Sequence, residues 1–364
     1  MKNQTLSQII SFLRFPLACL IVYLHYYTPD ISADVILQGR GTGLYAFVGD
    51  FFSHMLSVIV VPLFFFMSGY LYFISSADKG FTFQAWKKKS WNRVKSLVVP
   101  YVAWNLLVLA LFAGIQYLTG NSSTMQKDGY KLIADYQFVD YLKALWALDH
   151  SGMPMDGPLW FIRNLIVFSI VLSFPLYYCL IYAGIPTLVA LFVGSACELG
   201  FANISVDSVF YFAWGAFCAI KKFDLFTNVS ERMSRLFGLT ILGTLLLKIT
   251  FCVLKSPIEH YFNSLYIYTT VALIFGFLAP YIKKGVLKPM TFLASASFFI
   301  YAMHKPLQVI FRRYSFAILH PQSELLLCAL NLLIPAVVIA LCLLSFHIVR
   351  RYLPWLKFLN GFRG

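Results

Sequence analysis

The feature that most constrains this chain is a series of long apolar stretches that recurs along nearly its whole length. A helix that crosses a bilayer needs about 20 mostly apolar residues, because each residue adds only about 1.5 Å. We predict ten spans, of which the fifth and sixth are the shortest: 8–26, 47–74, 97–117, 159–181, 185–200, 206–220, 236–255, 261–282, 290–310 and 324–349.

Composition supports this interpretation, because 60% of the 364 residues are hydrophobic and only 12% are charged. Soluble domains contain about 25% charged residues. The sequence therefore predicts an all-α, polytopic membrane protein with about ten transmembrane helices. We expect one domain over residues 1–364, with no appended soluble domain.

Basic residues predict the orientation of these spans. The loops on the N-terminal side carry 18 Lys and Arg residues, whereas the loops on the opposite side carry 7. Cytoplasmic loops are enriched in Lys and Arg, so both termini are predicted to be cytoplasmic. The same loops account for the net charge of +14, and no nucleic-acid partner is needed to explain it.

Arg14 and His25 lie in the first apolar stretch, eleven residues apart. At about 100° per residue they share one helix face and lie about 16 Å apart along the axis. Charged and titratable side chains inside a membrane are costly and usually functional. We interpret Arg14 as a contact for an anionic donor and His25 as a general base. The alternative is an Arg14 paired with a buried carboxylate and a His25 bonded to the backbone.

The second stretch contains the run Phe64–Tyr70, which follows Pro62. Pro62 can kink the helix, and Gly69 allows another helix to approach closely. Ser68 is a candidate substrate contact in this run, although ordinary membrane packing explains the pattern equally well. His54, earlier in the same stretch, is predicted to be structural.

Two further helix faces carry candidate groups. Trp160 and Arg163 share a face at the start of the fourth stretch and are candidate substrate contacts, unless Arg163 only extends to the interface. Ser297, Tyr301 and His304 share a face of the ninth stretch. This polar face is predicted to point into the bundle or a cavity.

The long loops hold the remaining candidates. The inner loop 76–96 is strongly basic, and its Lys89 and Arg93 are either topology anchors or contacts for a ligand phosphate. In the outer loop 118–158, Asp149 and His150 are either acceptor contacts or a solvated pair. The seven cysteines are scattered without a paired motif, so no metal site is expected.

In this order and at these spacings, five patterns resemble the acyltransferase 3 family. They are Arg14-x10-His25, the segment 62–70, Arg93 before Pro100-Tyr101, the segment 158–161, and Ser297-x3-Tyr301-x2-His304. The resemblance implies an enzyme of about ten helices in the cytoplasmic (inner) membrane of a bacterium. It also implies transfer of an acetyl or related group from cytoplasmic acyl-CoA to a carbohydrate hydroxyl at the outer face, as in polysaccharide O-acetylation.

The resemblance makes His25 the catalytic residue and makes Arg14 and Arg93 donor contacts. We therefore expect the nucleotide end of acyl-CoA near Arg14, Arg93 and Lys89, with the thioester beside His25. Tyr301, Ser297 or His304 would donate to the developing oxyanion. Direct transfer and an acyl-histidine intermediate both remain open. The main alternative is a secondary transporter or channel for an anion or proton that uses the same intramembrane Arg and His residues.

Overall fold

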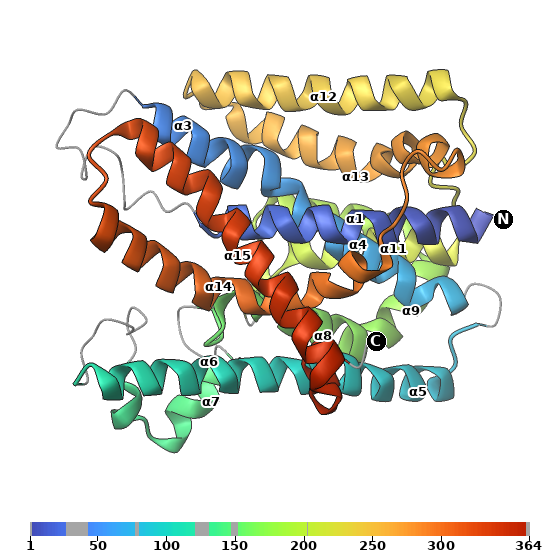
Figure 1. Ribbon diagram of the computed structural model, residues 1–364. Helices are drawn as coiled ribbons and strands as arrows, with labels where there is room; N and C mark the ends of the chain where they lie inside the picture. The colour runs from blue at the N-terminus through green and yellow to red at the C-terminus, as the bar shows by residue number, and fades with distance from the viewer. Residues whose placement is uncertain are drawn as a thin grey trace.

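Helices account for most of the described chain, as the apolar stretches predict (Figure 1). The structure is a computed structural model, and it describes residues 2–26, 43–76, 80–120, 131–146, 152–201 and 203–361. The elements in chain order are α1 (Lys2–Leu24), α3 (Leu44–Asp50), η1 (Phe51–Leu56), η2 (Ser57–Ile59), α4 (Val60–Phe73), η3 (Ile74–Ser76), α5 (Phe83–Arg93), η4 (Val94–Val98), α6 (Val99–Leu118), η6 (Ile133–Asp135), α7 (Phe138–Trp146), η7 (Gly157–Leu159), α8 (Trp160–Ile166), η8 (Val167–Leu172), α9 (Ser173–Tyr182), α10 (Gly184–Ala196), β1 (Gly200–Phe201), β2 (Ile204–Ser205), α11 (Val206–Ile220), α12 (Glu231–Val253), α13 (Glu259–Lys283), α14 (Thr291–Leu319), α15 (Glu324–Tyr352) and η9 (Pro354–Asn360).

Each of the ten predicted stretches coincides with a helix or a run of joined helices. In the described part of the chain, seven helical segments are long and apolar enough to cross a membrane. The fifth and sixth stretches form the shorter apolar helices α10 and α11, and the ninth lies in the 29-residue helix α14. The chain is thus an all-α membrane protein, apart from the small antiparallel pair β1–β2. The number of spans and the orientation of the termini stay predictions.

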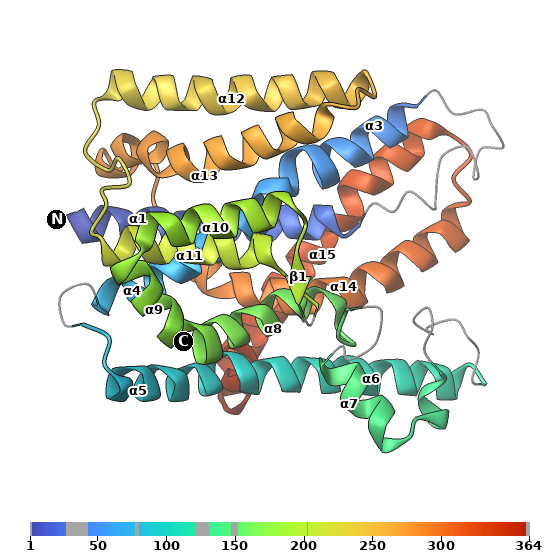
Figure 2. The same ribbon diagram turned by 180° about the vertical axis from the view of Figure 1, so that it is seen from behind.

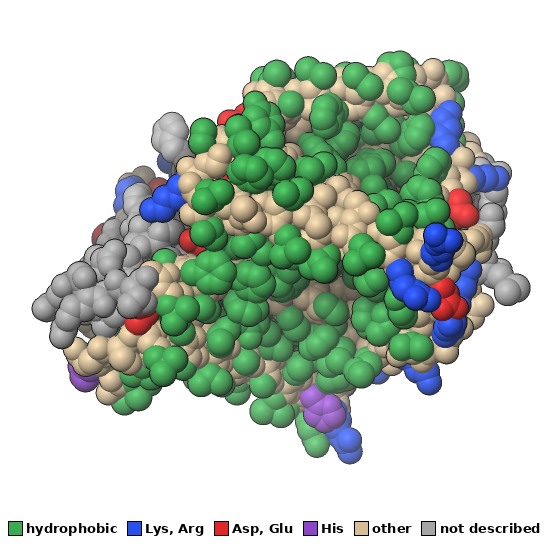
Figure 3. All heavy atoms as spheres, turned by 90° about the horizontal axis from the view of Figure 1, so that it is seen from above, with side chains coloured by type: hydrophobic (Ala, Val, Ile, Leu, Met, Phe, Trp, Pro, Cys, Tyr) green, Lys and Arg blue, Asp and Glu red, His purple; other side chains and the backbone are tan. Residues whose placement is uncertain are grey.

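The helices surround α1, which runs through the middle of the molecule (Figure 1). Helices α12 and α13 lie on one side of it, and the long α5–α6 helix lies on the opposite side. Helices α10 and α11 cover α1 from behind (Figure 2). From above, hydrophobic side chains cover most of the surface, and Lys and Arg side chains gather toward the end where the N-terminus lies (Figure 3). Such an apolar band is what a bilayer requires of a spanning protein.

One predicted loop is wrong, because much of the inner segment 76–96 is helical. Helix α5 begins after Thr82, whose hydroxyl accepts a hydrogen bond from the amide of Ala85 at 3.3 Å. It continues through the π-helical turn η4 into α6, so one helix extends from Phe83 to Leu118. The indole of Trp86 donates to the carbonyl of Ile170 at 3.0 Å. The prediction of a loop rested on the charge of this segment alone. Its lysine, glutamine and alanine residues favour helix.

The predicted close approach at Gly69 is confirmed between α4 and α11. A methyl group at Gly69 would overlap the carbonyl of Phe212, and one at Gly215 would overlap the carbonyl of Phe66. The two glycines therefore let the backbones touch from both sides, as small residues do at helix contacts in membranes. This contact holds the cavity-lining face of α4 in place.

We predict that Gly215→Ala lowers the thermal unfolding temperature of the detergent-solubilised protein. The added methyl has no room at the backbone of α4, and overpacking of this kind costs about 1–3 kcal/mol. Gly243→Ala is the matched control, because nothing lies within 4 Å of a methyl group there. That substitution should leave the unfolding temperature unchanged or slightly raised, because alanine favours helix. Equal unfolding temperatures for the two variants would contradict the close contact.

Candidate functional site

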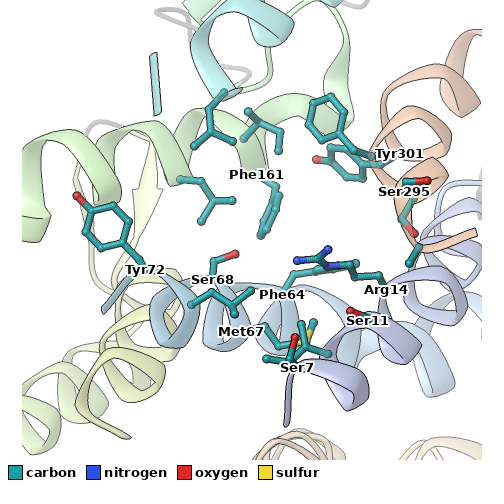
Figure 4. Close-up of a pocket in the computed structure, with 18 of the residues that line it drawn as sticks. Ser7, Ser11, Arg14, Phe64, Met67, Ser68, Tyr72, Phe161, Ser295 and Tyr301 are labelled. Atoms are coloured by element: carbon teal, nitrogen blue, oxygen red, sulfur yellow. The ribbon is translucent and has the colours of Figure 1, made fainter. Parts of the chain in front are cut away.

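A cavity of about 570 Å³ opens between the N-terminal half of α1, α4, α8 and the start of α14 (Figure 4). Its apolar wall includes Phe64, Met67, Phe161, Phe212 and Phe298. Its polar lining consists of Ser7, Gln8, Ser11, Arg14, Ser68, Tyr72, Arg93, Ser169, Thr291, Ser295, Ser297 and Tyr301. The volume is within the range of about 300–1,000 Å³ that is usual for small-molecule sites.

Two arginines bring positive charge to this cavity. The guanidinium of Arg14 points into the open space (Figure 4). The guanidinium of Arg93 lies over the ring of Tyr72, 5.3 Å from its centroid. Neither arginine makes a hydrogen bond or ion pair with any residue that the structure describes, so the carboxylate partner considered for Arg14 is not found there. Two unneutralised cations in one concave site suit an anionic ligand such as a phosphate.

Tyr301 and Ser297 line the same cavity from α14. The hydroxyl of Tyr301 donates to the carbonyl of Pro158, and its ring lies 5.9 Å from that of Phe161. The hydroxyl of Ser297 donates to the carbonyl of Leu293 at 3.0 Å. Ser68 faces the cavity from α4 (Figure 4). The predicted polar face of α14 therefore points into the bundle, and two of its three members reach the cavity.

His25 and His304 form a stacked pair outside the cavity lining. Their ring centroids are 5.4 Å apart, with 28° between the ring planes. His304 is fully buried, and its Nδ1 lies 2.7 Å from the carbonyl of Tyr301 and 3.2 Å from that of Ile300. Carbonyl oxygens only accept, so we assign the proton of the neutral ring to Nδ1. The Nε2 atom then remains an acceptor without a partner among the described residues.

The predicted path from Arg14 to His25 is not continuous in this structure. Arg14 lines the cavity, whereas His25 does not. Tyr301 stands between the two regions, because it lines the cavity and its ring lies 6.3 Å from that of His304. A ligand that entered beside Arg14 would therefore meet Tyr301 and Phe161 before it reached the histidine pair.

Helix α14 fixes the end of α1 that carries His25. Lys305 Nζ donates to the carbonyl of His25 at 3.0 Å, and Gln308 Nε2 donates to that of Val22 at 2.5 Å. Arg312 Nη1 donates to the carbonyl of Tyr26 at 3.4 Å. The last carbonyls of a helix have no partner within it. Lys305, Gln308 and Arg312, the α14 clamp, therefore satisfy these carbonyls and hold the imidazole of His25 against His304.

The α14 clamp was not predicted from the sequence, although the residue spacing indicates it. The polar face from Ser297 to His304 continues at helical spacing to Gln308 and Arg312. A face that stays polar for so long in a bundle helix indicates buried polar contacts along its whole length. Ser7 and Ser11 extend the Arg14 face of α1 in the same way, and both line the cavity.

Lys89, predicted to contact the donor, does not line the cavity. Its ammonium group donates to the carbonyl of Tyr72 at 2.5 Å and to the hydroxyl of Ser76 at 2.9 Å. It therefore stabilises the C-terminal end of α4, where a cation is favourable. Its contact with the donor stays a prediction.

Arg163 and Trp160, predicted to contact the substrate, also lie outside the cavity lining. Arg163 is only 3% exposed, so it does not extend to the interface. Its guanidinium donates to the carbonyls of Gly152 and Asn203, at 2.9 and 2.8 Å, and thereby joins the two segments that flank α8 and α11. Trp160 packs against Phe65, with ring centroids 6.3 Å apart. Their contacts with substrate stay predictions.

The last predicted residues are Asp149 and His150 in the outer loop and His54 in the second apolar stretch. His150, predicted to contact the acceptor, lies with Asp149 outside the described residues. His54 bonds Asp50 through Nδ1 at 3.1 Å, which fits the structural role expected for it. No group of three or more His, Cys, Asp or Glu residues that could hold a metal ion occurs in the described ranges.

Comparison with known families matches residues 8–349 to an acyltransferase domain, the domain of the acyltransferase 3 family. This range is nearly the whole chain, and it contains both arginines of the cavity and the His25–His304 pair. No curated protein and no solved structure matches the chain significantly.

We predict that Lys305→Met increases amide hydrogen exchange in the last turn of α1. Methionine keeps the apolar stem of the side chain but cannot donate to the carbonyl of His25. Loss of a charged donor costs about 1.5–3 kcal/mol, so exchange over residues 22–26 should accelerate about tenfold or more. The control is Lys284→Met, because Lys284 pairs with Glu231 on the exposed surface. Unchanged exchange in Lys305→Met would show that the α14 clamp does not hold this end.

Proposed function

Because the chain belongs to the acyltransferase 3 family, it is a membrane acyltransferase, and we propose that it moves an acyl group from cytoplasmic acyl-CoA to a carbohydrate hydroxyl at the outer face. The acyl group in this proposal is acetyl, which makes the protein an O-acetyltransferase of a bacterial inner membrane. The observation that carries the proposal is the cavity with two unpaired arginines beside the helix that presents His25.

The donor in this proposal enters the cavity from the N-terminal end of α1. The phosphates of CoA contact Arg14 and Arg93, whose guanidinium groups can each bind two phosphate oxygens. The apolar wall formed by residues such as Phe64 and Phe161 accepts the less polar pantetheine arm. In this proposal the arm extends toward Tyr301, whose ring contacts that of His304. Movement of the Tyr301 side chain would bring the thioester to that pair.

The chemistry in this proposal is general-base transfer at His25. The imidazole accepts the proton of the acceptor hydroxyl while the oxygen forms a bond to the thioester carbon. Tyr301 then donates to the oxyanion that develops on the carbonyl oxygen. The carbon–sulfur bond breaks, and the leaving thiolate of CoA takes the proton from the imidazolium. The Nε2 atom of His304 has no hydrogen-bond partner among the described residues. It is therefore a second group that can accept a hydroxyl proton at this position.

We predict that Arg14→Gln and Arg93→Gln each weaken CoA binding by about 10- to 100-fold. Each substitution removes one charge-assisted contact, which is worth about 1.5–3 kcal/mol. Thermal stabilisation of the purified protein by CoA, titrated in detergent, measures the effect. Arg232→Gln removes the same charge from the exposed start of α12 and should bind CoA as the wild type does. A wild-type protein that CoA does not stabilise would instead favour the transporter alternative.

We predict that His25→Ala binds CoA normally but loses acyl transfer by about 10²- to 10⁴-fold, because the general base is absent. Mass spectrometry of cell-surface glycans from cells that express each variant measures transfer. His260→Ala is the control, because His260 is exposed and, among the described residues, its imidazole bonds only locally, to the carbonyl of Pro257 at 3.0 Å. Full glycan acylation by a folded His25→Ala protein would rule out the proposed base.

A further inference from the structure

A second, smaller cavity meets α14 at Phe299, which does not line the larger cavity that contains Arg14. It has a volume of about 200 Å³ and is bounded by the end of α15, by η9 and by Phe299 of α14. Its apolar lining consists of Phe299, Phe346, Val349, Leu356 and Leu359. We call this cavity the C-terminal groove. An apolar floor of this kind suits a hydrocarbon chain, because contact with it removes apolar surface from water.

Two exposed cationic side chains line the C-terminal groove. Arg350 and Lys357 both line it and are exposed, and neither makes a hydrogen bond or ion pair with a described residue. Trp355, between them in sequence, is 70% exposed, and Tyr352 is 66% exposed. Trp and Tyr gather where a membrane meets water. The groove therefore combines an apolar floor, free positive charge and interfacial aromatic side chains.

We propose that the C-terminal groove binds an anionic phospholipid. The phosphate of the headgroup lies between Arg350 and Lys357, and an acyl chain lies along Phe346, Val349 and Leu356. The apolar floor argues against a free anion as the occupant, since such an anion gains nothing from it. The two cations argue against an uncharged lipid.

The lipid would also act on the wall of the larger cavity that Arg14 lines. Asn360 lines the groove, and its Nδ2 donates to the carbonyl of Ser295 at 3.1 Å. Ser295 in turn lines the larger cavity beside Arg14. The segment is also anchored by the indole of Trp104, which donates to the carbonyl of Leu359 at 2.8 Å. A lipid that orders Pro354–Asn360 therefore orders this wall and strengthens CoA binding, a consequence that rests on the proposed function.

The test of the lipid site is native mass spectrometry of the full chain with phosphatidylglycerol and with phosphatidylcholine. We expect Arg350→Gln/Lys357→Gln to weaken phosphatidylglycerol binding by about tenfold or more, because two surface charges are removed. The control Arg351→Gln/Arg232→Gln removes two exposed charges outside the groove and should change binding less than threefold. Equal losses in the two variants would overturn the site in favour of diffuse surface charge.

A second variant separates the lipid from a free phosphate. Val349→Trp fills the groove but keeps both cations, so it should also abolish selective phosphatidylglycerol binding. Retained binding in this variant would overturn the proposal, as would inorganic phosphate that competes fully with the lipid. The thermal unfolding temperature of each variant confirms that it is folded.

The coupling is tested with CoA. We expect phosphatidylglycerol to increase CoA affinity in the wild type and in Arg351→Gln/Arg232→Gln, but not in Arg350→Gln/Lys357→Gln, which binds the lipid weakly. Lipid binding without any effect on CoA affinity would overturn the coupling and leave the lipid site. If CoA fails to bind even with lipid present, the proposed function fails, and the native mass spectra still decide the lipid site.

Discussion

The contact between α1 and α14 determines where Arg14, His25 and the polar face of α14 lie relative to one another. Helix α1 carries Arg14 and is followed directly by His25, and α14 carries Ser297, Tyr301 and His304. Backbone carbonyls inside a membrane must find donors within the protein. The α14 clamp supplies three donors to the end of α1, from residues that lie about 280 positions later in the chain. A polar requirement of the backbone thus also places the imidazoles face to face.

The same interaction shows how far the sequence could predict the site. Helical spacing alone placed Arg14 and His25 on one face of the first span, and Ser297 and Tyr301 on one face of the ninth. Residues on one helix keep a fixed phase, so this part of the prediction needed no tertiary information. The structure then brought Arg14, Ser297 and Tyr301 to one cavity and paired His25 with His304.

The rest depended on contacts between distant segments, which spacing cannot reveal. Lys89 and Arg93 share one helix, yet Lys89 turns to the end of α4 while Arg93 faces the cavity. Arg163 was expected near substrate or the interface, but two loop carbonyls take up its donors. In each case a neighbouring carbonyl decides the orientation of the side chain. Which backbone carbonyls are free to accept depends on where helices end and how they pack. The residue type of the donor does not reveal this.

The separation of the arginines from the histidine pair has a physical consequence of its own. Water that followed a charged ligand through an open passage would reach the base and compete with an acceptor hydroxyl. Tyr301 lines the cavity and its ring lies 6.3 Å from that of His304, and its hydroxyl is held by the carbonyl of Pro158. On the proposed function, the Tyr301 side chain keeps the thioester from water until the acyl end of the donor displaces it. The hydroxyl released from Pro158 would then be the donor nearest the reacting carbonyl, so one side chain would both seal the site and complete it.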